Sequence, residues 1–195
     1  FVGDLPEIKQ RKIIRALVTY GKSDFHLADG RPLGIQIELL HLYEKFLNQG
    51  IRRDVEKTKV KIVPVHFDQL IPALEAGRGD VVAAFLTATS ERKKQLRFAL
   101  GNAEGVSEVL VSNKDAPKVN SWEELSGKKV YVMDGSSYAE NLKALNLTLK
   151  LRGVNTNNRL NPLRSTHLQR PTIRHIRLSV FRQANSQFLV FNHLF

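Results

Sequence analysis

The sequence predicts an α/β protein with parallel-rich sheets in two lobes, the second of which is incomplete. Apolar runs of strand length alternate with helical segments over residues 13–96, in the order βαβαβα, which is typical of a parallel sheet with right-handed crossovers. A second strand–turn–helix unit of the same design follows at residues 128–146. Beyond residue 153 this alternation stops.

The first elements follow from local patterns. Residues 5–10 are polar and helical, and an aspartate precedes them as a candidate N-cap. The apolar run IIRALVTY at residues 13–20 predicts a buried strand. The loop at residues 21–32 contains the turn signal Asp29-Gly30. Residues 34–47 place apolar side chains at helical spacing, which predicts an amphipathic helix.

The chain then alternates further. VKIVPV at residues 60–65 predicts a second strand, and residues 67–76 predict a short helix that ends at glycines. Residues 80–86 are the third predicted strand, and the polar residues 90–96 form a helix after it.

The second unit repeats this design. Residues 106–111 predict a strand, and SWEEL at residues 121–125 has the Ser-x-x-Glu pattern of a capping box. A strand at residues 128–133, a turn at residues 134–137 and a helix at residues 138–146 complete it. We therefore expect a first lobe at residues 1–105, the start of a second lobe at 106–153 and a basic tail at 154–195.

The tail has an unusual composition. Residues 1–150 hold 23 Lys and Arg against 19 Asp and Glu, a net charge of +4, whereas residues 151–195 hold seven Arg and no Lys, Asp or Glu. Two interpretations compete: a disordered basic segment that binds an anionic surface, or a shift of the reading frame near Gly153. We favour the frameshift, because Lys, Asp and Glu disappear together.

Composition excludes several classes of function. The 195 residues include no cysteine, so thiolate metal sites, disulfides and cysteine nucleophiles are absent. No run approaches the ~18 apolar residues that a membrane helix needs. The six histidines have no partners at metal spacing, and no nucleophile elbow or phosphate loop is present. We expect no catalytic residue, no metal site and no cofactor.

The chain begins at Phe1, and we expect a mature or trimmed product.

The motifs at residues 70–98 carry a resemblance. They combine Gly-x-x-Asp at residues 77–80, an apolar strand and Thr-x-Thr-x-Glu-Arg at residues 87–92. With Gly-Ser-Ser at residues 135–137, they resemble the type 2 periplasmic solute-binding proteins of family 3, which serve amino-acid ABC transporters. Residues 4–48 resemble more closely the regulatory domain at the N-terminus of membrane-bound lytic murein transglycosylase F. The resemblance implies the two-lobed periplasmic-binding-protein type 2 fold and runs to about residue 153.

The resemblance also implies a binding half-site at the strand-to-helix turn. Thr87 stands where the family binds a ligand carboxylate, and Arg92 can pair with such a carboxylate through two hydrogen bonds. Thr89 is expected beside them, although capping of the following helix is the favoured role for it. The alternative for Arg92 is a solvated helix charge that pairs with Glu91 or another neighbour.

The other half-site is expected at Ser136 and Ser137, with N-capping as the equal alternative. Phe25 stands where the family often places an aromatic ring against the ligand, and core packing is an equal alternative for it. The charged patterns at residues 91–94 and 140–143 are predicted to be solvated helix faces.

We expect non-catalytic binding of a small carboxylate-bearing ligand, such as an amino acid, a peptide or a muropeptide, in a cleft between the lobes. The resemblance favours a regulatory domain of a lytic murein transglycosylase, periplasmic and associated with the outer membrane through its parent protein, with a downstream catalytic domain as partner. The first alternative is a free solute-binding protein that delivers an amino acid to an ABC permease. The second alternative, a nucleic-acid-binding protein, rests on the net charge of +11 and is disfavoured.

Overall fold

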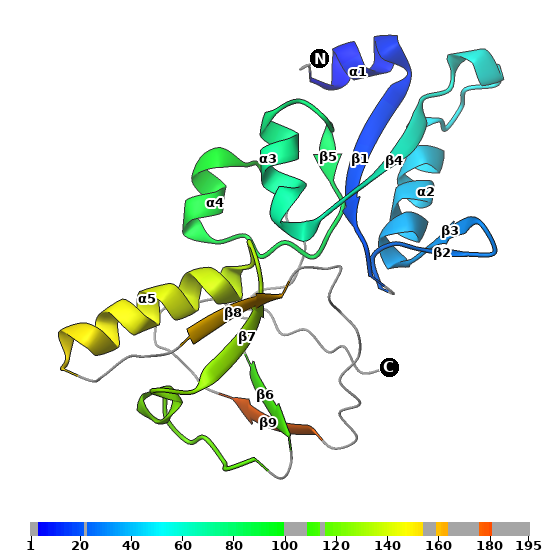
Figure 1. The fold of residues 1–195 in the computed structure, drawn as a ribbon. Helices are drawn as coiled ribbons and strands as arrows, with labels where there is room; N and C mark the ends of the chain where they lie inside the picture. The colour runs from blue at the N-terminus through cyan, green and yellow to red at the C-terminus, as the bar shows by residue number, and fades with distance from the viewer. Residues whose placement is uncertain are drawn as a thin grey trace. The chain divides into compact units, whose positions relative to one another are not determined.

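The computed structural model describes residues 4–21, 23–99, 109–113, 116–153, 159–163 and 176–180. The chain divides into two compact units, Phe1–Phe85 and Leu86–Phe195 (Figure 1). Each unit has its own hydrophobic core. The lobe limits expected from the sequence stay a prediction.

The first unit is built on a parallel sheet in the order β4-β1-β5. The central strand β1 (Ile13–Thr19) pairs along its whole length with β4 (Lys59–Val65) and, at Ala16 and Leu17, with β5 (Val81–Val82). Ala16, Leu17 and Val18 are completely buried. The apolar run that predicted a buried strand is therefore the centre of this unit.

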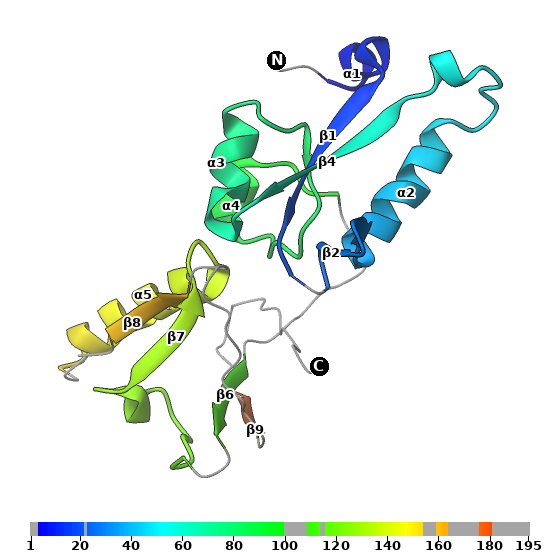
Figure 2. The ribbon, with the colours of Figure 1, turned by 45° about the vertical axis from the view of Figure 1, so that its right-hand side comes forward.

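Helices connect the strands of this sheet. After α1 (Leu5–Arg11) and β1, the chain passes through α2 (Ile35–Leu47) to β4, and then through η2 (Phe67–Gln69) and α3 (Leu70–Glu75) to β5. Figures 1 and 2 show α2 and α3 on opposite sides of the sheet. This follows because the chain moves outward to β4 and then back across β1, while both crossovers keep the same hand. A short turn, η1 (Asp54–Glu56), precedes β4.

The core of the first unit follows the alternation of side chains along β1. Ala16 and Val18 cluster with Ile37 and Leu40 of α2, while Leu17 points to the other face, as the period of a strand requires. There Gly79 approaches so closely that a Cβ atom on it would lie 2.3 Å from Cγ of Leu17.

Two details differ from the prediction. The loop at residues 21–32 contains a hairpin, β2 (His26–Ala28) and β3 (Arg31–Leu33). Asp29 and Gly30 both have positive φ, 51° and 75°, as in a type I′ turn, so the predicted turn is confirmed. The third strand was predicted too long: after Val82 one more backbone bond, from Ala83 N to Leu17 O (2.9 Å), holds the chain against β1.

The second unit contains a parallel pair and an antiparallel pair of strands. β7 (Lys129–Met133) passes through α5 (Ser137–Leu151) to its parallel partner β8 (Arg159–Leu163), and β6 (Val109–Asn113) pairs antiparallel with β9 (Ile176–Val180). Strands β8 and β9 lie in the segment where the sequence predicted no further alternation. The frameshift interpretation itself stays a prediction.

Two short helices, α4 (Ser90–Gln95) and η3 (Glu123–Leu125), complete the second unit. α5 extends beyond its predicted end at residue 146 because Leu149 is still part of the core. The buried members of that core come from the segment before β7, from β7 and from one face of α5: Val119, Leu125, Val130, Val132, Ala139, Leu142, Leu145 and Leu149.

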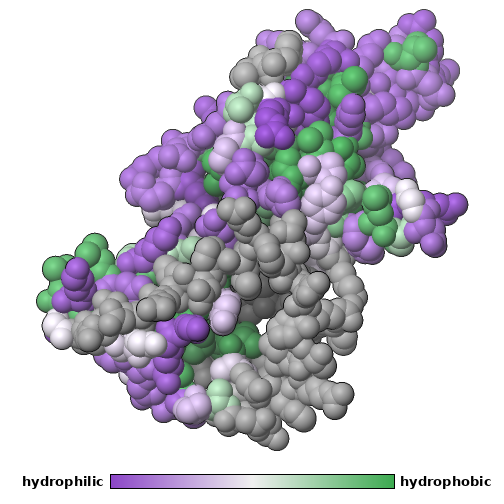
Figure 3. All heavy atoms as spheres, viewed as in Figure 1, coloured by the Kyte–Doolittle hydropathy of each residue, from purple (hydrophilic) through white to green (hydrophobic). Residues whose placement is uncertain are grey.

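Figure 3 shows hydrophilic residues over much of the described surface in this view, with hydrophobic residues between them. The outer face of α2 exposes Leu39, Leu42 and Phe46, while its inner face is buried, as predicted for an amphipathic helix. No helix in the described ranges has the length and apolar content that a membrane crossing needs.

A buried carboxylate fixes the start of β5 in the first unit. The Asp80 side chain is only 3% exposed. Its Oδ2 accepts hydrogen bonds from the backbone N of Arg15 (2.7 Å), from Nε of Arg15 (3.2 Å) and from Nη2 of Arg11 (2.7 Å), and its Oδ1 accepts from Nη2 of Arg15 (2.8 Å). Burial raises the pKa of Asp80, but these hydrogen bonds outweigh it and lower the pKa to about 2.

Because the pKa of Asp80 is lower in the folded chain, its contribution to stability is complete above about pH 4 and is lost as the pH falls through about 2. We expect a loss of about 2 kcal/mol in the free energy of unfolding over this range. At pH 7, Asp80→Asn should lower the free energy of unfolding by roughly 2–4 kcal/mol, because it breaks a buried ion pair. Urea unfolding at several pH values measures both.

The matched control is Asp54→Asn, because Asp54 pairs with Lys57 at an 88% exposed position. This substitution should leave the free energy of unfolding nearly unchanged. If the two substitutions lowered the free energy of unfolding equally, Asp80 would have no special role in stabilising the fold.

Candidate functional site

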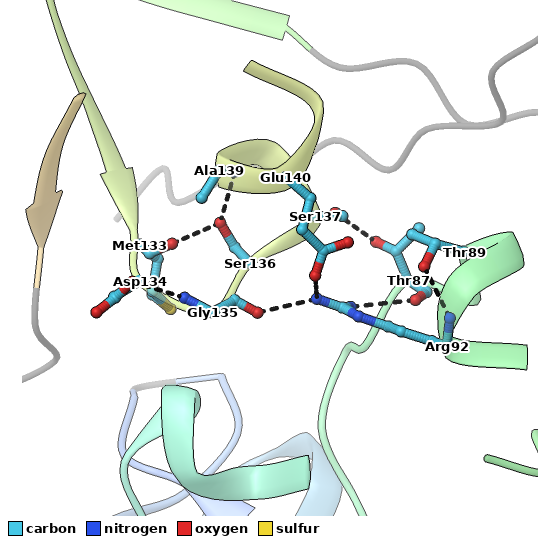
Figure 4. A network of polar contacts seen from close by, with 10 residues as sticks. All are labelled: Thr87, Thr89, Arg92, Met133, Asp134, Gly135, Ser136, Ser137, Ala139 and Glu140. Carbon is cyan, nitrogen blue, oxygen red and sulfur yellow. Dashed lines mark hydrogen bonds and ion pairs between the residues drawn. The ribbon is translucent and has the colours of Figure 1, made fainter. Parts of the chain in front are cut away.

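Five of the six predicted site residues lie together in the second unit (Figure 4). They come from α4 and the segment that leads into it, and from the start of α5 and its N-cap. These residues are Thr87, Thr89, Arg92, Ser136 and Ser137.

Arg92 is at the centre of this group. Its side chain is only 4% exposed, so the alternative of a solvated helix charge is wrong. Nη1 donates to the carbonyl of Thr87 (3.2 Å), and Nη2 donates to the carbonyl of Gly135 (2.9 Å) and to Oε1 of Glu140 (3.0 Å). The guanidinium therefore links the strand-to-helix turn before α4 to the first turn of α5.

The donors of Arg92 are not all used. A guanidinium carries five N–H groups, and Nε of Arg92 is buried without a hydrogen-bond partner in the described part of the chain. Glu140 accepts through one oxygen and is 47% exposed. The site thus combines a buried positive charge, an unpaired buried donor and a half-exposed counter-charge.

Two hydroxyl groups lie beside the guanidinium. Oγ of Ser137 donates to Oγ1 of Thr87 at 3.1 Å, and both residues are buried. Because Thr87 accepts in this pair, its own hydroxyl proton is available to a further acceptor. The sequence predicted both residues, and the structure brings them into contact across 50 positions of the chain.

The other two hydroxyls cap helices. Oγ1 of Thr89 accepts from the backbone N of Arg92 (3.3 Å), and Oγ of Ser136 accepts from the backbone N of Ala139 (3.3 Å) and donates to the carbonyl of Met133 (2.6 Å). Both residues therefore cap helices, which was the favoured role for Thr89 and the equal alternative for Ser136. α4 has only six residues, so its N-terminus by itself makes no anion site.

Phe25 belongs to the first unit. It is 5% exposed and lies in the core with Ala16, Val18, Ile37 and Leu40. Its ring meets Tyr20 edge-on, with 5.4 Å between the ring centroids. Core packing thus accounts for its position, and contact with a ligand stays a prediction.

The sequence analysis missed Glu140. It predicted solvated faces for both charged patterns, which fits the exposed pair of Lys94 and Glu91 (2.7 Å). Glu140 is also half-exposed, but the analysis did not anticipate its ion pair with the buried Arg92. The available signal was its position four residues after Ser136, in the first turn of a helix that begins beside the predicted half-site. Among the described residues, no group of three His, Asp or Glu side chains has the arrangement to hold a metal ion.

The comparisons with known proteins agree on one family. Residues 15–190 match the bacterial extracellular solute-binding proteins, family 3. The match extends past residue 153, where the sequence analysis placed the end of the resemblance. Solved structures confirm the predicted fold class: the chain is an α/β protein of the periplasmic-binding-protein type 2 class. It belongs to the bacterial extracellular solute-binding proteins, family 3.

Its relatives include a lytic murein transglycosylase and an L-cystine-binding protein. The chain is 34% identical over 120 residues to the membrane-bound lytic murein transglycosylase F of Maricaulis maris, covering 62% of this chain and 24% of that protein. It is 28% identical over 143 residues to the L-cystine-binding protein TcyJ of Escherichia coli (strain K12), covering 72% and 50%. The chain thus spans a quarter to a half of these relatives' lengths.

Two solved structures are similar. An ancestral arginine-binding protein bound to arginine has a TM-score of 0.60 and 30% identity, over 78% of this chain and 61% of that one. The ancestral amino acid-binding protein AncCDT-1, a precursor of cyclohexadienyl dehydratase, has a TM-score of 0.61 and 27% identity, over 82% and 64%.

The cap of α5 gives a prediction about the integrity of the site. Ser136→Ala removes the side-chain acceptor at the helix start and should lower the free energy of unfolding by about 1 kcal/mol. Ser90→Ala is the matched control, because Ser90 is exposed at the start of α4 and its loss should stay within about 0.5 kcal/mol. Chemical denaturation followed by circular dichroism measures both, and a cost for Ser136→Ala no larger than for Ser90→Ala would contradict the assignment.

Proposed function

We propose that this chain binds a small carboxylate-bearing ligand of the amino-acid type and performs no chemistry on it. Membership of the solute-binding family supports this proposal. So do relatives named for L-cystine and for L-glutamate and L-aspartate, and a similar structure bound to arginine.

The observation that carries the proposal is Nε of Arg92, a buried donor without a hydrogen-bond partner in the described ranges. Burying a polar group without a partner costs free energy, and a buried guanidinium is best satisfied by a planar acceptor with two oxygens. A ligand carboxylate is such an acceptor. Binding would satisfy Nε and stabilise a charge that the described residues leave incompletely paired.

Neighbouring groups have distinct roles in this proposal. Thr87 and Ser137 supply hydroxyls to the polar end of the ligand, and their mutual hydrogen bond holds them in place. Thr89 and Ser136 act indirectly, because their caps fix the first turns of α4 and α5.

Two parent proteins are compatible with this binding function. The chain resembles transglycosylase F in Maricaulis maris and, with 32% identity, in Aeromonas hydrophila, and we favour a periplasmic regulatory domain that senses an amino acid or a muropeptide for a downstream catalytic domain. The alternative is a free binding protein that delivers an amino acid to an ABC permease, as the similarity to TcyJ suggests.

Binding can be tested with the ligands that the relatives name. Isothermal titration of L-arginine, L-glutamine, L-glutamate and L-cystine should identify at least one that binds, and at a hundredfold excess over its Kd it should raise the melting temperature by about 5–10 °C. Arg92→Lys keeps the charge but not the planar fork, and should weaken binding at least about tenfold.

The matched control is Arg97→Lys, the same substitution at an exposed position just after α4. It should bind the ligand with the same affinity as the natural chain. Circular dichroism should show that both variants are folded. Equal affinity of the natural chain and Arg92→Lys would refute the role of Arg92.

The coding DNA separates the two parents. A regulatory domain predicts an open reading frame that continues, in this frame or a restored one, into a lysozyme-like domain with a catalytic glutamate. A transporter component predicts a stop codon after the solute-binding domain, close to a permease gene. The same DNA tests the frameshift: a downstream alternative frame that restores acidic residues and a strand–helix pattern is expected, and its absence would contradict that interpretation.

A further inference from the structure

We propose that Glu140 is an internal competitor for the ligand: its carboxylate occupies Arg92 in the empty chain and must leave before a ligand carboxylate binds there. This inference rests on the proposed function, since it concerns the same site. It assigns to Glu140 a role in setting affinity and selectivity, without direct contact with the bound ligand.

The three acceptors on the guanidinium differ in how easily they can leave. The carbonyls of Thr87 and Gly135 belong to the backbone of the two turns that lead into α4 and α5. Glu140 is a side chain, 47% exposed, whereas Arg92 itself is 4% exposed. Glu140 can therefore rotate into water while the arginine and the backbone stay in place.

The pair leaves hydrogen-bonding capacity of the guanidinium unused among the described residues. Glu140 contacts only Nη2 and uses only Oε1, while Nε remains unpaired within the described residues. Nε and Nη2 lie on one edge of a guanidinium, and that edge matches the two oxygens of a carboxylate. A ligand carboxylate on this edge would make two hydrogen bonds where Glu140 makes one.

Moving the Glu140 carboxylate away from Arg92 requires little free energy. Glu140 lies in the first turn of α5, a helix of 15 residues, where the N-terminal end of the helix dipole favours a negative charge whether or not Arg92 is paired. The exchange replaces one carboxylate with another, so the charge around the buried guanidinium is conserved. A neutral amide in the ligand's place would leave Arg92 without a counter-charge, so the exchange selects for carboxylates.

The experiment compares Glu140→Gln with Glu91→Gln. Glu91 is an exposed glutamate that pairs with Lys94, so its substitution removes the same charge without vacating Arg92. The probes are L-arginine, L-glutamine, L-glutamate and L-cystine, measured by isothermal titration. We expect Glu140→Gln to raise the affinity for each bound probe about fivefold, because a larger fraction of molecules has an accessible guanidinium. Glu91→Gln should leave the affinity unchanged.

A second variant, Glu140→Ala, removes the amide oxygen of glutamine, which could still accept a hydrogen bond from Arg92. It should show at least the same gain in affinity. The gain should vanish when Arg92→Lys is combined with Glu140→Gln, because the competitor and the ligand share one arginine. Unchanged affinity in both Glu140 variants would assign Glu140 a structural role only and overturn the inference. Weaker binding would make Glu140 a ligand contact and overturn it as well.

These outcomes separate the inference from the proposed function. Binding by the natural chain that Arg92→Lys weakens, without a gain in the Glu140 variants, upholds the proposed function and refutes the inference. Binding that appears only in the Glu140 variants supports the inference and shows that Glu140 blocks the site in the natural chain. Absence of binding in all variants refutes both.

Discussion

A buried positive charge is the main constraint on the second unit. Arg92 is almost completely removed from water, and a buried guanidinium must find acceptors because its desolvation is otherwise uncompensated. The chain supplies them from two turns that are far apart in sequence, at Thr87 and Gly135, and from Glu140. These bonds, with the hydroxyl pair beside them, fix the segment before α4 against the first turn of α5.

The first unit also contains a buried charge, but a negative one. Comparing the two charges distinguishes a structural group from a functional one. Asp80 receives four hydrogen bonds, from Arg11 and from the side chain and backbone of Arg15, and a carboxylate has about four acceptor positions. Its requirement is met within the chain, so it acts as a structural anchor. Arg92 retains a buried donor without a partner among the described residues, and we propose that an external acceptor completes its pairing.

What the sequence predicted, and what it did not, follows from the range of the interactions. β1, β4, α2 and the cap residues Thr89 and Ser136 depend on local periodicity and on the first turn of a helix, so they were predictable. The short length of β5 and the pairing of β8 and β9 depend on partners elsewhere in the sheets. The contact between Arg92 and Glu140 spans 48 positions, and no local pattern distinguishes a glutamate on a solvated face from one that covers a buried arginine.

A counter-charge on a side chain gives such a site two properties together. The empty chain folds without an isolated buried charge, because Glu140 partly compensates Arg92. The same group reduces affinity, because each ligand must first displace it. A site without it would bind more tightly but would leave the guanidinium less compensated when empty. Stability of the empty chain and affinity for the ligand are thus opposed through one residue, and its half-exposed position in the first turn of α5 allows both states.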